Sequence, residues 1–273
     1  MTLPIFYNSL DRRTDRRTYM EEQLGALGLS AERHSAVDMT EVDEDELSRT
    51  VDFRMPRIHM SVQSACNAVS HLEMHRRFLE TGAPMALMLE DDVALAQDIP
   101  ALVRSAEWLP VGVGVVQLER YRPGRSPRLV GPPMAEPVPG RQIRLIYSRT
   151  GGSACYLITR QAAALVAGNA GRLTTPIDHL LFSPNASPLF RRLGVAVMMP
   201  APARQNEEKF ASDIAAAREE RRKTALGRLR RAWFEINCLP RQVMQMAQGA
   251  RWEPFAYAEM PETSGEGRGP AAS

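Results

Sequence analysis

Residues 83–93 read Ala-Pro-Met-Ala-Leu-Met-Leu-Glu-Asp-Asp-Val, and this stretch decides the fold. Its apolar run ends abruptly at three consecutive carboxylates, Glu90, Asp91 and Asp92. A short apolar run that follows Gly82 and Pro84 predicts a buried central strand of an α/β sheet. Ligands of such sheets bind beyond the carboxyl ends of the strands. Because three adjacent acids repel one another, we expect a cation among them, and a hard divalent metal carrying a diphosphate is the natural candidate.

The composition excludes several classes of protein. The chain has 273 residues, of which 44% are hydrophobic and 24% charged, and its net charge is only +2. This balance is typical of a folded protein and predicts no nucleic-acid partner. The cysteines Cys66, Cys155 and Cys238 have no paired spacing, which favours a reducing compartment. With neither a signal peptide nor an apolar run of membrane-spanning length, the expected location is cytoplasmic.

Strand-like and helix-like segments alternate as far as residue 199. Strands are expected at residues 3–7, over the apolar run that follows the turn at 82–84 and ends at the acids 90–92, and at 112–118, 143–147, 154–158 and 195–199. Helices are expected from 14 to about 25 or 28, at 41–47, 65–79 and 160–167, and from 175–176. Residues 121–140 are rich in proline and glycine and are expected to form a loop. This order predicts an α/β catalytic domain over residues 1–205 with a largely parallel sheet. A basic helical extension over 206–260 and a disordered tail over 261–273 are expected to follow.

Six segments occur in an order that resembles a known family. They are residues 5–13 with Arg16 and Arg17, Ser70-His71, residues 89–93, 151–158, 176–182, and Gln205 with 212–214. Together they resemble glycosyltransferase family 25, the bacterial lipooligosaccharide galactosyltransferase type that includes the collagen galactosyltransferases. The resemblance implies a GT-A-like architecture, a single Rossmann-type domain that binds a nucleotide sugar. The Gly-Glu pair that often precedes Ser-His in the family is absent here, where residues 62–66 carry no acid.

The acidic motif is the predicted metal and donor site. In an extended strand end, Glu90 and Asp92 point to one side and Asp91 to the other. We therefore expect Asp92 to bind Mn²⁺ or Mg²⁺ and Glu90 to lie near the metal or the ribose. Asp91 would line the donor site. A solvated turn after the strand is the alternative.

The loop after the first strand is the predicted nucleotide site. Asn8 and Asp11 would contact the base or ribose of a UDP-sugar. The four arginines of this segment, Arg12, Arg13, Arg16 and Arg17, would contact the diphosphate or the nucleoside, and guanidinium groups bind phosphate well. Resemblance adds Gly152, in the small-residue strand, to this site. The alternative for at least two of these arginines is a solvated helix face.

Asp178 is the candidate general base that deprotonates the acceptor hydroxyl. It lies in the first turn of a predicted helix after Pro176, where the helix dipole also favours a carboxylate, and that structural role is the alternative. His179 is a candidate second metal ligand or phosphate donor. His71 and His75 share a helix face, but Glu73 is misplaced for a zinc-protease motif, so a packed, hydrogen-bonded histidine is favoured.

The sequence therefore predicts a metal-dependent inverting glycosyltransferase, which moves a hexose, galactose from UDP-galactose, to a lipooligosaccharide or other surface glycan. The alternatives are a sugar nucleotidyltransferase, disfavoured because residues 8–13 hold neither Gly nor Lys, and a degenerate transferase that acts as a binding module. The basic segment 218–234, with Trp233 and Phe234, is either a helix that binds an anionic membrane surface peripherally or one packed on the domain.

Overall fold

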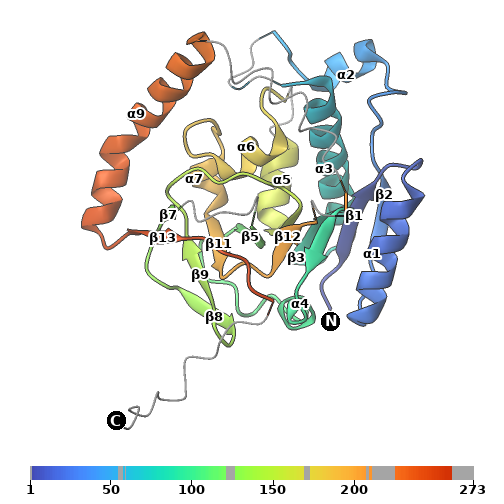
Figure 1. Cartoon of the computed structure of the whole chain (residues 1–273), viewed down its shortest axis with the longest axis horizontal. Helices are drawn as coiled ribbons and strands as arrows, with labels where there is room; N and C mark the ends of the chain where they lie inside the picture. Colours follow the sequence, from blue (N-terminus) through green and yellow to red (C-terminus); the bar gives the residue numbers. More distant parts are fainter. Residues whose placement is uncertain are drawn as a thin grey trace, which may run out of the picture.

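The computed structural model describes residues 2–54, 58, 60–120, 127–168, 173–206, 209–210 and 225–259. A large sheet forms the centre of this part of the chain, with the strand order β2-β1-β3-β10-β5-β11-β9-β8 (Figure 1). Its strands are β1 (Ile5–Ser9), β2 (Glu32–Ser35), β3 (Met85–Glu90), β5 (Val115–Gln117), β8 (Ala135–Val138), β9 (Arg141–Leu145), β10 (Cys155–Thr159) and β11 (Val195–Met199). The expected α/β class is confirmed.

The sheet is mixed rather than largely parallel, so that expectation was wrong. Strand β1 is parallel to β2 and β3, and β11 is parallel to β5. Strand β10 runs antiparallel to both of its neighbours, β3 and β5. At the far end, β8 and β9 are separated by only two residues, and so short a connection can only join antiparallel strands.

Helices cover both faces of the sheet. One face packs against α3 (Val62–Glu80), α5 (Arg160–Gly168), α6 (Ile177–Phe182) and α7 (Phe190–Leu193), with α2 (Glu44–Thr50) beside α3. The other face packs against α1 (Thr14–Ala26) and α4 (Ile99–Leu102). Alternate strand residues enter the two cores, because side chains of a strand point to opposite faces. Phe6 and Met88 lie in the first core, and Tyr7 and Leu89 in the second.

Two small sheets complete the described structure. One joins β4 (Val93–Leu95), β12 (Ala203–Gln205) and β6 (Glu119–Arg120), and the other pairs β7 (Pro127–Val130) with β13 (Arg251–Pro254). Strands β7 and β8 contradict the loop expected over residues 121–140, of which 121–126 lie outside the described residues. Both are edge strands with prolines, and an edge position tolerates proline because one side of the strand needs no backbone donor.

The C-terminal part of the chain returns to the body of the molecule. Helix α9 (Ala225–Ala247) runs along the edge farthest from α1 (Figure 1). After it, β13 pairs with β7, and Phe255 is fully buried in the first core. Residues 211–224 and 260–273, which include part of the predicted basic segment and the predicted tail, lie outside the described residues.

Candidate active site

The carboxyl ends of β1 and β3 lie side by side. The strands are parallel, and Asn8 stands opposite Glu90 in their register. The loops that follow the two strands therefore share one edge of the sheet, where α/β proteins bind ligands. A cavity of about 430 Å³ opens at this edge. It is lined by Asn8, Ser9, Leu10, Arg12, Arg13, Arg16, Ala36, Val37, Asp38, Met39, Gln63, Cys66, Asn67, Ser70, Glu90, Asp91, Asp92 and Gln205.

Three donors hold the carboxylate of Glu90. Its Oε1 accepts hydrogen bonds from Ser153 Oγ at 2.7 Å, His71 Nε2 at 3.1 Å and Asn67 Nδ2 at 3.3 Å. Burial would raise the pKa of Glu90, but hydrogen bonds from these groups and the nearby His71 lower it below its usual value. Glu90 is thus held in the ionised form and in a fixed position.

Behind Glu90 the hydrogen bonds continue into the core. Tyr156 on β10 is fully buried, and its hydroxyl lies 2.9 Å from His71 Nδ1 and 2.8 Å from His75 Nε2. Burial, together with the nearby His71, lowers the pKa of His75 to about 3, so His75 is neutral. The hydrogen-bonded packing expected for His71 is confirmed, and a connected chain links His75, Tyr156, His71 and Glu90.

The cation among the other two acids is Arg16. Its Nη1 donates to Asp91 Oδ1 at 3.1 Å and to Asp92 Oδ2 at 3.2 Å, and Ser9 Oγ also donates to Asp91 at 2.7 Å. The strict alternation expected along this motif was wrong, because β3 ends at Glu90 and the next two residues form a turn. Both aspartates reach the same guanidinium. Arg16 therefore supplies a positive charge to the two aspartates; it also lines the cavity, and its expected phosphate contact stays a prediction.

One oxygen of Asp92 is left for another partner. Oδ1 is buried and accepts no hydrogen bond within the described structure. Burial first, and then the charge of Glu90, raise the pKa of Asp92 to about 7. Among the described residues, no three His, Cys, Asp or Glu side chains form a group that would hold a metal alone. Mg²⁺ and Mn²⁺ need only one or two carboxylates when phosphates and water supply the other ligands, and the oxygens present fit that requirement.

The basic loop contributes two arginines to the cavity wall. Arg12 Nε donates to Asp38 at 2.5 Å, and Arg13 pairs with Asp15 at 2.8 Å; both arginines line the cavity. Two other predicted nucleotide contacts in this part of the chain, Asp11 and Arg17, are absent from the described lining. Asp11 is largely exposed and pairs with Arg33, and Arg17 donates to the Asp11 carbonyl. These two residues shape the loop in this structure.

Glu119 is a buried acid that the sequence reasoning missed. Its Oε2 accepts a hydrogen bond from Ala154 N at 2.7 Å, while Oε1 has no partner among the described residues. Burial, and then the charge of Glu90, raise its pKa well above the usual value. Glu119 follows a largely apolar segment, residues 113–118, in which Gln117 is the one polar side chain, and this partial likeness to Glu90 was the available signal.

Gly152 lies against Glu119. It has a φ of +90°, and a Cβ at this position would stand 2.5 Å from Glu119 Oε2. Gln117 Nε2 also donates to the carbonyls of Gly151 and Gly152, at 2.8 and 3.0 Å. The structure thus gives Gly152 a structural reason for being glycine, and the residue is absent from the described lining of the cavity.

Comparison with known proteins agrees with the motifs. Residues 2–111 match the model of glycosyltransferase family 25, described as an LPS biosynthesis protein. This match confirms the resemblance over the part of the chain that carries Asn8, Arg16 and the acids 90–92, and it supports a role in glycosyl transfer.

Comparison with curated sequences and with solved structures does not extend this assignment. No curated protein sequence matches the chain. Among solved structures, the chain is similar to "a glycosyltransferase involved in the glycosylation of the major capsid of PBCV-1", with 9% sequence identity and a TM-score of 0.40. The similarity covers 81% of this chain and 98% of that one, but at this TM-score it supports no conclusion.

The candidate base lies beyond the family 25 match. Asp178 is in the first turn of α6, and its charge is the last of the influences that raise the pKa of Glu119, after burial and the charges of Glu90 and Asp92. His179 Nδ1 lies 2.8 Å from Ser183 Oγ one helical turn later, and the structure does not bring His179 into a ligand group with Glu90 and Asp92. Neither residue is among those described as lining the cavity.

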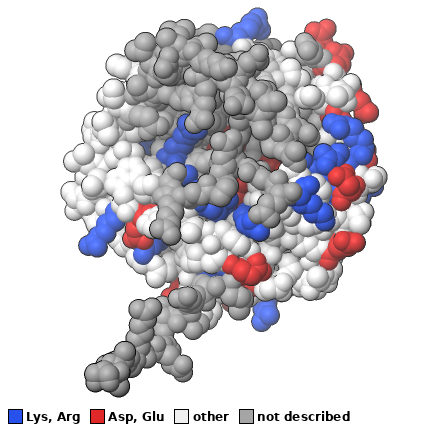
Figure 2. All heavy atoms as spheres, viewed as in Figure 1, with Lys and Arg blue, Asp and Glu red and all other residues white. Residues whose placement is uncertain are grey.

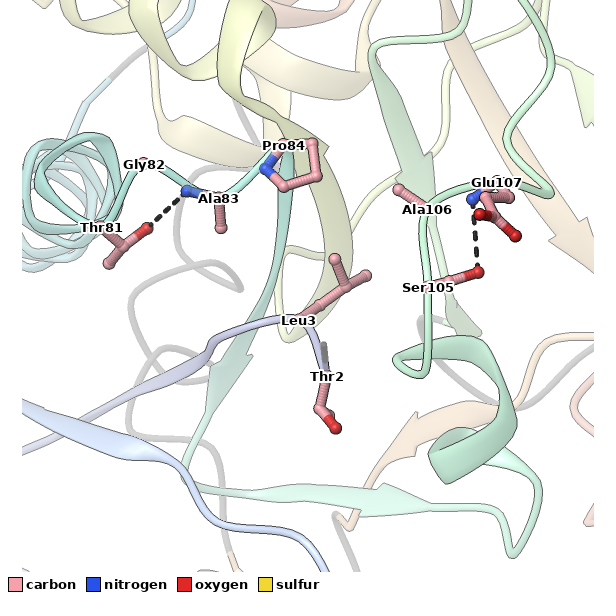
Figure 3. Close-up of a pocket in the computed structure, with 9 residues that line it drawn as sticks. All are labelled: Thr2, Leu3, Thr81, Gly82, Ala83, Pro84, Ser105, Ala106 and Glu107. Atoms are coloured by element: carbon pink, nitrogen blue, oxygen red, sulfur yellow. Dashed lines mark hydrogen bonds between the residues drawn. The ribbon is translucent and has the colours of Figure 1, made fainter.

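A second cavity, of about 680 Å³, lies at the opposite ends of β1 and β3 (Figure 3). The chain segments before these strands line it, Thr2 and Leu3 on one side and residues 81–84 on another. Glu107 is the one ionisable side chain in its described lining, and the dashed contacts in Figure 3 are hydrogen bonds within short turns. This cavity is larger, but it lacks the convergent polar groups of a catalytic site.

Proposed function

We propose that this chain transfers a hexose from a UDP-sugar to a glycan acceptor, with inversion and with the help of Mn²⁺ or Mg²⁺. The parallel alignment of Asn8 with Glu90 carries the proposal. It sets the basic loop and the acid cluster around one cavity, within the residues that match family 25.

The residues would divide the work as follows. Asp92, with its unpartnered Oδ1, and the ionised Glu90 would hold the metal. When bound, the metal neutralises charge on the leaving diphosphate as a Lewis acid. Arg12 and Arg13 would bind phosphate oxygens from the loop side, Asn8 the nucleoside, and Arg16 would keep the two aspartates in place. His179 would serve only as an additional contact to metal or phosphate, which requires α6 to approach.

Asp178 would deprotonate the acceptor hydroxyl as it attacks the anomeric carbon. Its place in the first turn of α6, within the segment 176–182 that resembles family 25, supports this assignment. The acceptor would therefore enter between α6 and the acid cluster.

The donor and acceptor are proposed from the family resemblance. Galactose from UDP-galactose would be transferred to a lipooligosaccharide or another surface glycan. Such an acceptor is carried on lipid, so the enzyme would work in the cytoplasm at the inner face of the membrane, attached peripherally.

Thermal-shift titration and donor turnover test the proposal. UDP should raise the melting temperature only with Mn²⁺ present, since a ligand of the native state stabilises it by mass action. Release of UDP should then be fastest with UDP-galactose among UDP-galactose, UDP-glucose and the N-acetylated sugars. Binding without turnover of any donor would indicate a non-catalytic module, and no response to any nucleotide would contradict the proposed donor class.

An Asp92→Ala variant tests the metal assignment. It should lose about a hundredfold or more in metal-dependent turnover, by analogy with the loss of other groups that stabilise transition-state charge. Glu73→Gln is a matched control, because Glu73 lies on α3 and pairs with His34 outside the cavity lining. Full metal-dependent turnover by Asp92→Ala would contradict the assignment.

A further inference from the structure

Helix α9 exposes most of its large apolar side chains. Trp233, Ile236, Leu239, Val243, Met244 and Met246 are between 47% and 64% exposed. They account for most of the large apolar side chains that are exposed in the described structure. An exposed apolar group of this size on one element is typical of an interaction surface.

One polar residue of α9 faces the protein. Gln242 is buried, and its Nε2 donates to the Tyr147 carbonyl at 3.4 Å. A helix rotates by about 100° per residue, so Trp233 lies on the side opposite Gln242, and Ile236 and Val243 lie on the same outward half. A surface helix ordinarily buries its apolar stripe against the core. Here the described residues leave the large apolar side chains of α9 exposed instead.

The sequence of α9 is basic. Within α9, Arg228, Arg230, Arg231 and Arg241 outnumber the one acid, Glu235. Arg191 on α7 lies close enough to Arg241 to lower the pKa of Arg241, in addition to the effect of burial. In Figure 2 most visible acidic side chains lie on the side of α1 and α2, away from α9. A second copy of this chain would bring like charges together, whereas an anionic surface would complement them.

We propose that the outward face of α9 docks on an anionic lipid bilayer, with the helix lying in the plane of the interface. Apolar side chains flanked by arginines are what such an interface binds. None of the described helices is long and apolar enough to cross a membrane, so docking here is peripheral. The surface is centred on residues 233–246, later in the chain than the basic segment 218–234 that the sequence had indicated.

This inference deepens the proposed function, since it would hold the enzyme where a lipid-carried acceptor is presented. The two proposals rest on different parts of the molecule, however, because no residue of α9 is in the described lining of the cavity. Lipid binding and UDP binding can therefore fail independently.

Co-sedimentation of the full chain with vesicles tests the proposal. The chain should bind vesicles of phosphatidylcholine with phosphatidylglycerol at least about tenfold more tightly than phosphatidylcholine alone, and less at high salt. The triple variant Trp233→Ser, Ile236→Ser, Val243→Ser should lose about tenfold or more of this binding because less apolar surface enters the interface. Trp252→Ser, on β13, is the matched control with a 47% exposed tryptophan and should bind like the wild type.

Two readouts exclude trivial explanations. Circular dichroism and UDP-induced thermal shifts should be the same for the wild type and the triple variant, which separates lost docking from lost folding. Lipids brominated in their acyl chains should quench wild-type fluorescence more than that of Trp233→Phe. Absence of binding to anionic vesicles, or equal binding by the triple variant, would overturn the proposal. So would a dimer in light scattering that the triple substitution dissociates, since α9 would then bind a second copy.

Discussion

The hydroxyl of Tyr156 joins two buried histidines to the acid cluster. Tyr156→Phe would leave His71 Nδ1 and His75 Nε2 without this partner in the core. Unpaired buried groups cost about 1–3 kcal/mol, so we expect a loss of stability of that size in urea unfolding. Because His71 in turn holds Glu90, turnover should also fall by about tenfold or more, as it does when outer-shell partners of a metal ligand are lost.

Tyr7→Phe is the matched control for this variant. Tyr7 lies on β1, faces the other core, and donates a single hydrogen bond to Glu21 at 3.3 Å. We expect its turnover to stay within about twofold of the wild type. Equal turnover of Tyr156→Phe and Tyr7→Phe at saturating donor would show that the hydrogen-bonded chain does not position Glu90.

The raised pKa of Asp92 predicts that stability and metal binding depend on pH in opposite directions. Its pKa is about 7 in the folded protein, above the ordinary value of 3.8, because burial and Glu90 disfavour the charge. The stabilisation from its protonated form is therefore complete below about pH 4 and is lost as the pH rises through 7. Metal binding has the opposite trend, because it needs the ionised form, and should weaken about tenfold per pH unit below 7.

Calorimetric titration of Mn²⁺ between pH 5.5 and 8 measures this effect. Asp92→Asn carries no titrating group, so its urea midpoint without metal should decline less than that of the wild type over the same range. Metal affinity that is flat across this interval, or parallel stability curves for the two proteins, would contradict the assigned pKa.

The sequence indicated some site residues and not others for physical reasons. Glu90 and Asp92 could be predicted because an apolar run that stops at acids marks a strand end, and ligands of α/β sheets bind beyond the carboxyl ends of the strands. The role of Arg16 could not be predicted, because its pairing with Asp91 joins residues 75 positions apart and depends on how α1 packs. Tyr156 was missed because it resembles an ordinary strand residue until its neighbours are known, whereas Glu119 was missed although it follows a largely apolar segment as Glu90 does.

At the scale of elements, the loop before β10 packs closely against the carboxylate of Glu119. Gly152→Ala would place its Cβ 2.5 Å from Glu119 in a backbone of positive φ. Gly28→Ala is the control, since Gly28 has a φ of +66° and nothing within 4 Å of the added Cβ. Both variants incur backbone strain of about 1 kcal/mol, and Gly152→Ala should lose at least about 1 kcal/mol more from the clash. Equal urea midpoints would show that Glu119 moves away freely.

The sequence predicted best those helices and strands that carry a clear apolar pattern. Helix α3 and strands β1, β3 and β11 were expected nearly as they occur, because strong apolar periodicity marks them. Strands β2 and β8 were not, because each is an edge strand with polar or proline residues and little apolar signal. Their pairing is imposed by tertiary neighbours, to which a local sequence pattern is insensitive.

At the scale of the whole molecule, residues 255–259 pack against the domain that holds the central sheet. Arg141 on β9 is fully buried and pairs with Asp98, and its Nη2 also donates to the carbonyls of Ala258 at 2.9 Å and Glu259 at 3.0 Å. Phe255 fills the first core. The sequence-based division at residue 205 stays a prediction, and these contacts give it a direct test.

A chain ending at Gln205 should be less stable by about 3–5 kcal/mol, the usual cost of removing one buried phenylalanine from a core. Loss of two acceptors from a buried guanidinium should add to that cost, because Arg141 would keep its charge with fewer partners. A chain ending at Glu259 keeps all of these contacts and is the control. Urea unfolding of both chains measures the difference. If the shorter chain unfolds at the same urea concentration, residues 206–260 are a separable extension. If it unfolds much earlier, the segment that carries α9 is anchored at its far end in the same core that positions the acid cluster.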